Sequence, residues 1–378
     1  MEQRSRRRFG DKEIVERKEE HIDICLREDV EARRVSAGFD DVFLVHRAAP
    51  EINLSDIDLS TVFLAHKFSA PIFVEAITGG TENAAKINAA IAEAVEDLNI
   101  GMGVGSQRAA LEKSELESTY RIAREKAPTA FLAANIGASQ ICMEGGARLA
   151  ERAVEMIDAD ALVIHLNPLQ ESIQPEGEVN YSGILGKIDE ISRALDVPVI
   201  VKETGAGISA EDARRLKGAG VSAIDVAGAG GTSWAAVEYY RAKKRQNHLR
   251  EELGISLWDW GIPTVVSLVE VSQSVDLPLI ASGGIRSGLD AAKSLAIGAS
   301  LAGFALPILE AASKGSENVK RKIALVIHEL RTVMFLSGAS DLEKLRSVPI
   351  VITGRTAEWL RARGFQIETY ARRGGLRE

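Results

Sequence analysis

Short apolar runs rich in Val, Ile and Ala alternate along the chain with longer stretches whose apolar residues recur at helical spacing. Continuous apolar runs of this length are typical of strands that are buried on both faces of a parallel sheet. The stretches between them are rich in Ala, Glu and Lys, which favours amphipathic helices. The pattern predicts eight strands, over residues 71–77, 100–104, 130–136, 161–166, 198–202, 223–227, 277–281 and 301–305.

Helical stretches separate these strands, and some begin with a residue that can cap a helix N-terminus. Ser209 and Ser287 each stand two or three positions before an acidic residue, a pattern typical of such caps. The clearest helices are predicted over residues 83–99, 145–157, 184–195, 209–219, 265–274 and 287–297.

Eight strand–helix units favour a (β/α)8 barrel, the TIM barrel. The alternative is an open doubly wound sheet, whose nucleotide-binding form needs Gly-x-Gly-x-x-Gly directly after the first strand. Here the first strand is followed by Thr78-Gly79-Gly80-Thr81, and the glycines within 101–105 are also spaced differently. The sequence therefore favours the barrel.

Two segments lie outside the eight units. Residues 1–70 form an N-terminal extension with a charged helix predicted over 11–34, and residues 318–378 form a C-terminal helical segment, with the barrel over 71–317 between them. We expect the C-terminal helices at 319–337, 341–347 and 356–363. The sequence predicts an unusually long loop over residues 228–261, with its own aromatic side chains. Such loops are typical of a lid or a partner surface.

Charge and composition narrow the class of protein. The chain has 46 Lys and Arg against 54 Asp and Glu, a net charge of −8, which argues against nucleic acid or an anionic membrane as partner. Its two cysteines cannot form a disulfide framework, so we expect a reducing, cytoplasmic compartment. No apolar run reaches the roughly 18 residues of a membrane span. The basic cluster of Arg4, Arg6, Arg7 and Arg8 lacks a following apolar region, so we expect a solvated tail and not a signal peptide.

Polar or glycine residues follow seven of the eight predicted strands, although the strands themselves are apolar. In a barrel these strand ends meet at one mouth, where barrel enzymes place their active sites. The convergence therefore predicts a polar ligand there.

Glycine-rich turns near the last strands suggest a phosphate site. Gly283 and Gly284 precede Arg286 and a helix, and Gly230-Gly231-Thr232 offers further backbone N–H groups. The alternative is that these glycines only allow tight turns. Lys202, at the end of an apolar strand, either forms a salt bridge with Glu203 or Glu171, or faces an electron-rich ligand such as the N1–C2=O edge of a flavin.

His165, Asn167, Gln170 and Glu171 place an imidazole, two amides and a carboxylate within seven residues after the fourth strand. One carboxylate together with substrate phosphates is a common way to hold Mg²⁺. In the N-terminal helix, Arg17 and His21 share a face next to Lys18, but a solvated charged helix explains the same pattern.

Taken in order, these residues resemble the FMN-dependent, type 2 isopentenyl-diphosphate isomerase family. The resemblance runs from about Arg17 to Leu306. It is carried by Arg17-Lys18-Glu19-Glu20-His21, Thr78-Gly79-Gly80-Thr81, Gly105-Ser106-Gln107-Arg108, the segment from His165 to Glu171, Val201-Lys202-Glu203, Gly230-Gly231-Thr232 and Gly283-Gly284-Ile285-Arg286.

The resemblance implies an enzyme of isoprenoid biosynthesis that interconverts isopentenyl and dimethylallyl diphosphate on reduced FMN, with Mg²⁺ and with NADPH or NADH as reductant. It implies a homo-oligomer, a tetramer or an octamer. The implied FMN contacts are Ala76, Ile77, Thr78, Ser106, Asn135, Lys202, Thr232, Gly284, Ile285, Arg286, Ala305 and Leu306. The implied substrate contacts are Arg17, Lys18, Gln107, Arg108 and Gln170, with Glu171 as the metal ligand. We predict His21 and Ser106 as further substrate contacts, and Gln170, His165 and Asn167 as the catalytic group.

Two alternative functions also fit the sequence at this point. An FMN-dependent 2-hydroxy-acid oxidase or dehydrogenase would use the same barrel. That class needs a catalytic His after the seventh strand, and this sequence has no His at that place. A non-catalytic flavin- or phosphate-binding barrel would need neither Glu171 nor the cations Arg17 and Lys18.

Overall fold

Eight parallel strands close into a barrel in the computed structural model, which describes residues 11–374. The strands follow one another around the barrel in chain order, and the last pairs with the first. This confirms the predicted fold class and all eight strands. They are β4 (Ile72–Val74), β5 (Gly101–Gly103), β6 (Leu132–Gly137), β7 (Ala161–Leu166), β8 (Val199–Glu203), β9 (Ala223–Asp225), β10 (Leu279–Ala281) and β11 (Leu301–Phe304).

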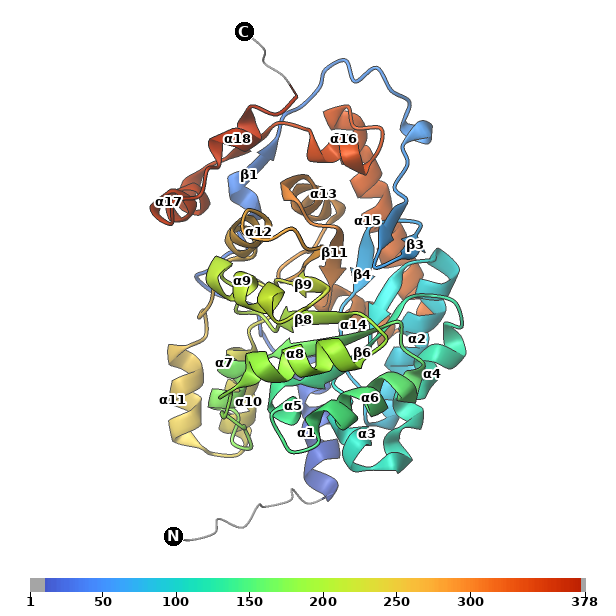
Figure 1. Cartoon of the computed structure of the whole chain (residues 1–378), viewed down its shortest axis with the longest axis vertical. Coiled ribbons are helices and arrows are strands. Elements are labelled where there is room, and N and C mark those ends of the chain that lie inside the picture. Colours follow the sequence, from blue (N-terminus) through green and yellow to red (C-terminus); the bar gives the residue numbers. More distant parts are fainter. Residues whose placement is uncertain (1–10, 375–378) are drawn as a thin grey trace.

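Helices cover the outside of the barrel (Figure 1). Each predicted helix between strands is present within about three residues, and the two predicted caps are confirmed: Ser209 Oγ accepts from Asp212 N at 3.1 Å, and Ser287 forms a capping box with Asp290. Apart from two helices between β9 and β10 that are described below, the helices between strands are α2 (Glu82–Leu98), α3 (Arg108–Glu112), α4 (Ser118–Lys126), α5 (Ala138–Ile141), α6 (Gly146–Ile157), α7 (Pro168–Ile173), α8 (Ile184–Ala194), α9 (Ala210–Gly218), α12 (Thr264–Ser272) and α13 (Gly288–Ile297).

The interior of the barrel is an apolar core. Every residue of the eight strands except the last two of β7 is buried, which is why the strands read as continuous apolar runs. The core extends outward to the inner faces of the surrounding helices. Within residues 11–374, no helix is both long enough and apolar enough to cross a membrane.

The segments before and after the barrel pair with each other. Strand β1 (Val42–Leu44) runs antiparallel to β12 (Ile350–Ile352), and both lie with the C-terminal helices at one end of the molecule (Figure 1). The three-part division of the chain stays a prediction, and the arginine cluster at residues 4–8 lies outside the described residues. The remaining elements are β2 (Thr61–Phe63), β3 (His66–Phe68), α14 (Leu306–Ala312), α15 (Ser316–Ser337), α16 (Leu342–Arg346), α17 (Gly354–Ala362), α18 (Glu368–Ala371) and the 3-10 turns η1 (Phe39–Asp41), η2 (Leu54–Asp56) and η3 (Ser114–Leu116).

The N-terminal helix is shorter than the sequence predicts. Helix α1 spans Asp11–Arg27 and not 11–34. Beyond it the chain pairs with the loop after β9: Ala32 N donates to Gly231 O and Ser233 N donates to Val30 O, both at 2.8 Å. These backbone hydrogen bonds replace those of a longer helix.

The stretch 228–261 is not a long loop, and this part of the prediction is wrong. It contains two helices, α10 (Trp234–Lys244) and α11 (His248–Ser256), and Asn247 caps the second. Most of its aromatic side chains pack inward: Trp258 joins a small core with Ile24 and Val30 of the α1 segment, and only Trp260 is largely exposed. Helix α10 escaped the sequence pattern because its buried face carries two charged residues, Glu238 and Arg241.

Candidate functional site

One large cavity opens at the carboxyl ends of the barrel strands, beneath α1. Its empty volume, including space open to solvent, is about 1500 Å³. The structure brings nearly every candidate residue to it. Those that line the cavity are Arg17, Lys18, His21, Ala76, Ile77, Thr78, Ser106, Arg108, Asn135, His165, Asn167, Gln170, Glu171, Lys202, Thr232, Gly284, Ile285, Arg286, Ala305 and Leu306.

Gln107, a predicted substrate contact, does not line the cavity. Its side chain is fully buried in the wall, where Nε2 donates to Ala153 O at 2.8 Å and Oε1 accepts from Asn135 N at 2.8 Å. Because both polar ends are engaged with backbone groups, the side chain holds β6 and α6 together.

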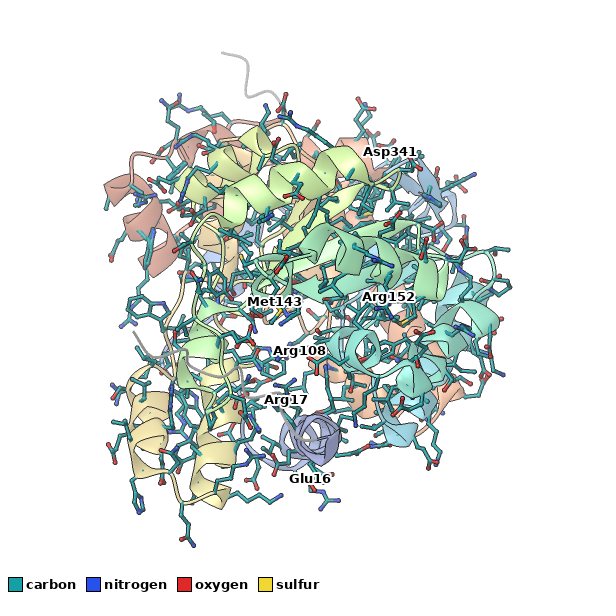
Figure 2. All side chains as sticks on the ribbon, turned by 60° about the horizontal axis from the view of Figure 1, so that its bottom comes forward. Glu16, Arg17, Arg108, Met143, Arg152 and Asp341 are labelled. Carbon is teal, nitrogen blue, oxygen red and sulfur yellow. The ribbon has the colours of Figure 1, made fainter. Side chains whose placement is uncertain are left out.

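Three cations gather between α1 and the barrel wall. Figure 2 shows Arg17 of α1 close to Arg108 of α3, and Lys18 Nζ donates to Ser106 O at 3.4 Å. Burial and the charges of Arg17 and Arg108 lower the pKa of Lys18 to about 7. Arg108 is also held by Glu112 Oε1 at 2.9 Å and lies 3.6 Å from Glu178 Oε1. Such a group of close positive charges is suited to a polyanion.

The polar groups after β7 lie in the cavity beside these cations. Asn167 Nδ2 donates to Gln170 Oε1 and to Glu171 Oε1, both at 3.1 Å, and Glu171 Oε2 accepts from Glu178 N at 2.6 Å. Pro168 begins the short helix α7 that turns these side chains inward. Burial raises the pKa of Glu171, although its hydrogen bonds act in the opposite direction.

His165 is a neutral imidazole in this setting. Burial, with the charge of Lys202, lowers its pKa to about 3. Its Nδ1 lies 2.6 Å from Asn135 Oδ1, and an amide oxygen only accepts, so Nδ1 carries the proton and Nε2 is left as an acceptor.

Lys202 lies at the floor of the cavity. Strand register places His165, Lys202 and Asp225 side by side on β7, β8 and β9, so the three side chains share one level of the barrel. The Nζ of Lys202 donates to Glu203 O at 2.7 Å and lies 3.4 Å from Asp225 Oδ2 and 3.5 Å from Glu75 Oε2. Lys202 lines the cavity, and the carboxyl groups nearest its ammonium are those of Asp225 and Glu75; the alternative of a salt bridge to Glu203 or Glu171 is not what the structure shows.

A glycine cradle lines another part of the cavity wall. Gly283 and Gly284 have φ of 96° and 70°, and a Cβ on Gly283 would overlap the backbone of Gly228. The amides of Gly284 and Ile285 donate to no other group of the described chain, which leaves them free to bind an anion. Arg286 stands beside them, where Glu31 Oε1 accepts from its Nη2 at 2.6 Å.

Sequence reasoning missed Glu238 and Arg241, two charged residues of α10 that hold helix α1 over the cavity. Because α1 covers the mouth of the cavity, we call it the cap. His21 Nε2 lies 3.0 Å from Glu238 Oε1, and Gln170 Nε2 donates to the same oxygen at 3.2 Å. Burial alone would raise the pKa of Glu238, but the contacts with His21 and Arg241 lower it to about 2. The sequence offered one signal for these two residues: Glu238 and Arg241 are spaced i, i+3, so they meet on one face of the helix.

Arg241 completes this network. Its side chain has no exposed surface, and it donates to Glu238 Oε2 at 2.6 Å, to Glu176 Oε1 at 2.8 Å and to Glu20 Oε2 at 3.2 Å. One guanidinium thus joins α1, α10 and the turn after α7.

The comparisons with known proteins agree with this geometry. Residues 169–351 match the family model described as FMN-dependent dehydrogenase. The chain is 56% identical to an isopentenyl-diphosphate delta-isomerase of Methanothermobacter thermautotrophicus, over 95% of this chain and 99% of that one. It is 53% identical to the enzyme of that name from Methanosarcina barkeri, over 94% and 96%, and 50% identical to that from Pyrococcus furiosus, over 96% and 93%.

Solved structures of similar fold are more distant in sequence. A mandelate oxidase superposes with a TM-score of 0.60 at 19% identity, over 91% of this chain and 97% of that one. A flavocytochrome b2 superposes with a TM-score of 0.63 at 17% identity, over 95% and 85%. At this identity the likeness supports the barrel fold alone.

Proposed function

The chain belongs to the FMN-dependent, type 2 isopentenyl-diphosphate delta-isomerase family, and we propose that its cavity moves the double bond of isopentenyl diphosphate on reduced FMN, with Mg²⁺ bound at Glu171. The observation that carries the proposal is one cavity with a cationic site at its cap and a separate anion cradle at its wall. Such a cavity holds a phosphorylated cofactor and a diphosphate substrate at the same time.

The residues present fit FMN. The cradle of Gly284 and Ile285 offers unbonded amides to the phosphate, and Thr232 and Arg286 stand beside it. Ala76, Ile77 and Thr78 would line the ring, with Ser106, Asn135 and Lys202 at its polar edge and Ala305 and Leu306 along its length. When bound in the reduced state, with NADPH or NADH as reductant, the flavin supplies an acid and a base next to the alkene and an anionic ring that stabilises a developing cation.

The cap would bind the diphosphate. Arg17 and Arg108 present guanidinium groups, which suit phosphate oxygens, and Lys18 adds an ammonium near them. Anchoring the charged end holds the apolar tail over the flavin, so binding energy remote from the reacting carbons positions them.

Mg²⁺ would be held only together with substrate. Of the two carboxylates that line the cavity in the described chain, Glu75 and Glu171, Glu171 is the one near Arg17 and Arg108, and within the described residues no cluster of three or more acidic, His or Cys side chains forms a ready metal site. A single carboxylate with phosphate oxygens and waters is a usual way to bind Mg²⁺. We therefore expect tight metal binding only after the diphosphate has entered.

The polar residues after β7 would orient the reacting carbons. Gln170 Nε2 is fixed by Glu238, and Asn167 holds Gln170 from the other side, so the amide is placed without freedom to rotate. Neutral His165 fixes the Asn135 amide and adds no positive charge next to the ring. We assign Gln170 to substrate positioning, and His165 and Asn167 to holding the groups around it.

The experiment is an optical spectrum of the purified protein, followed by isomerisation under nitrogen with and without dithionite. We expect a flavin spectrum, and isomerisation that depends on reduction and on Mg²⁺. Equal activity in both conditions, or a protein that does not take up FMN, would contradict the mechanism. Oxidation of lactate or glycolate by the oxidised protein would favour the 2-hydroxy-acid oxidase instead.

A further inference from the structure

Glu75 is a buried acid at the floor of the cavity that the proposed chemistry does not use. It follows β4 directly, and its amide donates to Phe304 O at 3.0 Å. The residue is 4% exposed and lines the cavity. Neither carboxyl oxygen has a hydrogen-bond partner in the described part of the chain. A buried polar group without a partner is costly, so this carboxyl needs a proton, a ligand or both.

The barrel makes room for this side chain. Gly303 lies on β11, next to β4, and a Cβ at that position would overlap Glu75 Oε1 and come within 2.9 Å of Ser282 Cβ. Glycine weakens a strand interior, since it has no side chain to pack. Its presence here gives Glu75 a defined place beside Lys202.

The charges around Lys202 do not balance if both neighbouring acids are ionised. Lys202 faces Asp225 at 3.4 Å and Glu75 at 3.5 Å, and Asp225 is 1% exposed. Two carboxylates and one ammonium would leave a buried negative charge, which costs free energy unless a proton is taken up. One of the two acids must therefore be neutral.

Hydrogen bonding decides which acid carries the proton. Asp225 Oδ1 accepts from Ser282 Oγ at 2.6 Å and from Ala227 N at 3.2 Å, and these donors stabilise the ionised form. Glu75 accepts no hydrogen bond from a hydroxyl or amide of the described chain, and the Lys202 ammonium near it is shared with Asp225. Burial and the charge of Asp225 also raise the pKa of Glu75 well above its usual range. The other titratable groups near this floor are His165 on β7, which is neutral, and Glu203 on β8, whose carboxyl accepts from the amide of Thr204.

We propose that Glu75 is a neutral carboxylic acid that positions the ammonium of Lys202 under the flavin and presents its O–H to the polar edge of that ring. The Glu75–Lys202–Asp225 group then has no net charge. An ionised Glu75 would instead put a negative charge beside the anionic reduced ring. The role toward the flavin rests on FMN occupying the cavity as proposed above, whereas the protonation of Glu75 does not.

Infrared difference spectra of the apoprotein test the protonation state without cofactor. The spectrum of Glu75→Gln is subtracted from that of the wild type at neutral pH, so that other protonated acids cancel. We expect a carboxylic acid C=O band that is present only in the wild type and shifts in heavy water. A carboxylate band lost in its place would overturn the proposal.

The midpoint potential of bound FMN tests the charge beneath the ring. Glu75→Gln exchanges one neutral group for another of the same shape, so we expect an unchanged potential. Asp225→Asn is the matched control: it removes a real negative charge from the same lysine, and we expect a rise of about 30 mV or more, a tenfold change for a two-electron couple. A rise in Glu75→Gln as large as that in Asp225→Asn would show that Glu75 is ionised and would overturn the proposal.

FMN titration separates this inference from the proposed function. Glu75→Leu removes the O–H donor, and we expect FMN to bind about fivefold more weakly, the loss of one hydrogen bond, with affinity restored in Glu75→Gln. Equal affinity in all three proteins contradicts the role at the flavin edge. A wild-type protein that does not bind FMN contradicts the proposed function, and the infrared band is then still a valid test of the neutral acid.

Discussion

Two parts of the cavity are built in different ways. The anion cradle at Gly283 and Gly284 belongs to the barrel wall, where backbone geometry and close packing against the β9 loop fix it. The cap is α1, and what holds it on the mouth is a set of buried charges on α10, more than 200 residues further along the chain. The cradle depends on the absence of side chains, and the cap depends on side chains that must stay charged and paired.

This difference teaches where the site is fragile. A backbone cradle resists changes of pH and is damaged by an added methyl group. A cap held by ion pairs tolerates small changes of shape and fails when one charge is removed, because the partners are then buried and unpaired. The following predictions test that contrast.

The largest effect is expected from Arg241→Ala. The change leaves Glu238, Glu176 and Glu20 without their shared partner, and breaking such a buried pair costs about 3–5 kcal/mol. We expect a lower free energy of unfolding in urea and a higher KM, since α1 loosens. Arg245→Ala is the control: Arg245 pairs with the same Glu20 and Glu176 but is 33% exposed, so its loss should cost no more than about 1 kcal/mol. Similar losses in the two variants would show that the cap does not depend on the buried charge.

Gly283→Ala should damage the cradle and leave the cap intact. The new Cβ would overlap Gly228, at a backbone φ of 96° that an alanine adopts only with strain of about 1–3 kcal/mol. We expect weaker FMN binding in a fluorescence titration. In the control Gly218→Ala, at the end of α9, nothing lies within 4 Å of the new Cβ, so FMN affinity should not change. Wild-type affinity in Gly283→Ala would mean that the cradle is not the phosphate site.

The cap, unlike the cradle, should respond to pH through Lys18. Its pKa of about 7 means that the folded protein loses this positive charge as the pH rises through 7, so the KM for the diphosphate substrate should increase there. Between about 7 and the ordinary lysine value the unfolded chain binds the extra proton, so the free energy of unfolding should rise with pH over that range.

The variant Lys18→Arg is the control for this pH effect, because arginine stays charged over the whole range. We expect its KM to be nearly independent of pH between 6 and 9. A wild-type KM that is equally flat would mean that Lys18 does not bind the substrate in its titrating form.

The smallest effect is expected where the two regions meet. Glu31 follows α1 and pairs with Arg286 next to the cradle, and both side chains are partly exposed. Exposed pairs contribute about 0–1 kcal/mol, so Glu31→Gln should change the free energy of unfolding little. FMN binding should tighten by at most about fivefold, because Arg286 no longer has to release the Glu31 carboxylate before it binds the phosphate. Glu28→Gln, an exposed neighbour, should leave FMN affinity unchanged. Weaker FMN binding in Glu31→Gln would instead mean that Glu31 holds Arg286 in place for the phosphate.

The barrel could be predicted because its signals are local. Each strand is an apolar run that stands between helices with clear caps, as at Ser209 and Ser287, and parallel strands of a barrel bring their carboxyl ends together whatever the details of packing. For the same reason the positions of Lys202, Gly284 and Glu171 at one mouth followed from their places after the strands.

Errors arose where tertiary contacts overrode local signals. Helix α1 ends early because the chain after it pairs with residues 231–233. The Gln107 side chain lies in the wall because backbone groups of β6 and α6 bind both of its polar ends. Helix α10 was not predicted because its buried face carries Glu238 and Arg241. The contacts that end α1 and bury Gln107 lie far away in sequence, and the charged pair in α10 is buried only through contacts with α1 and the turn after α7.

The sequence by itself determined the fold class, the family and the set of residues at the barrel mouth, because hydrophobic period and strand-end chemistry are properties of neighbouring residues. Only the tertiary structure decided which partners those residues have: that Arg241 ties the cap down, that Lys202 sits between two acids, and that Glu75 has no hydrogen-bond donor in the described chain. The charge state of a buried group depends on its distances to groups from other elements, and those distances exist only once the barrel has closed.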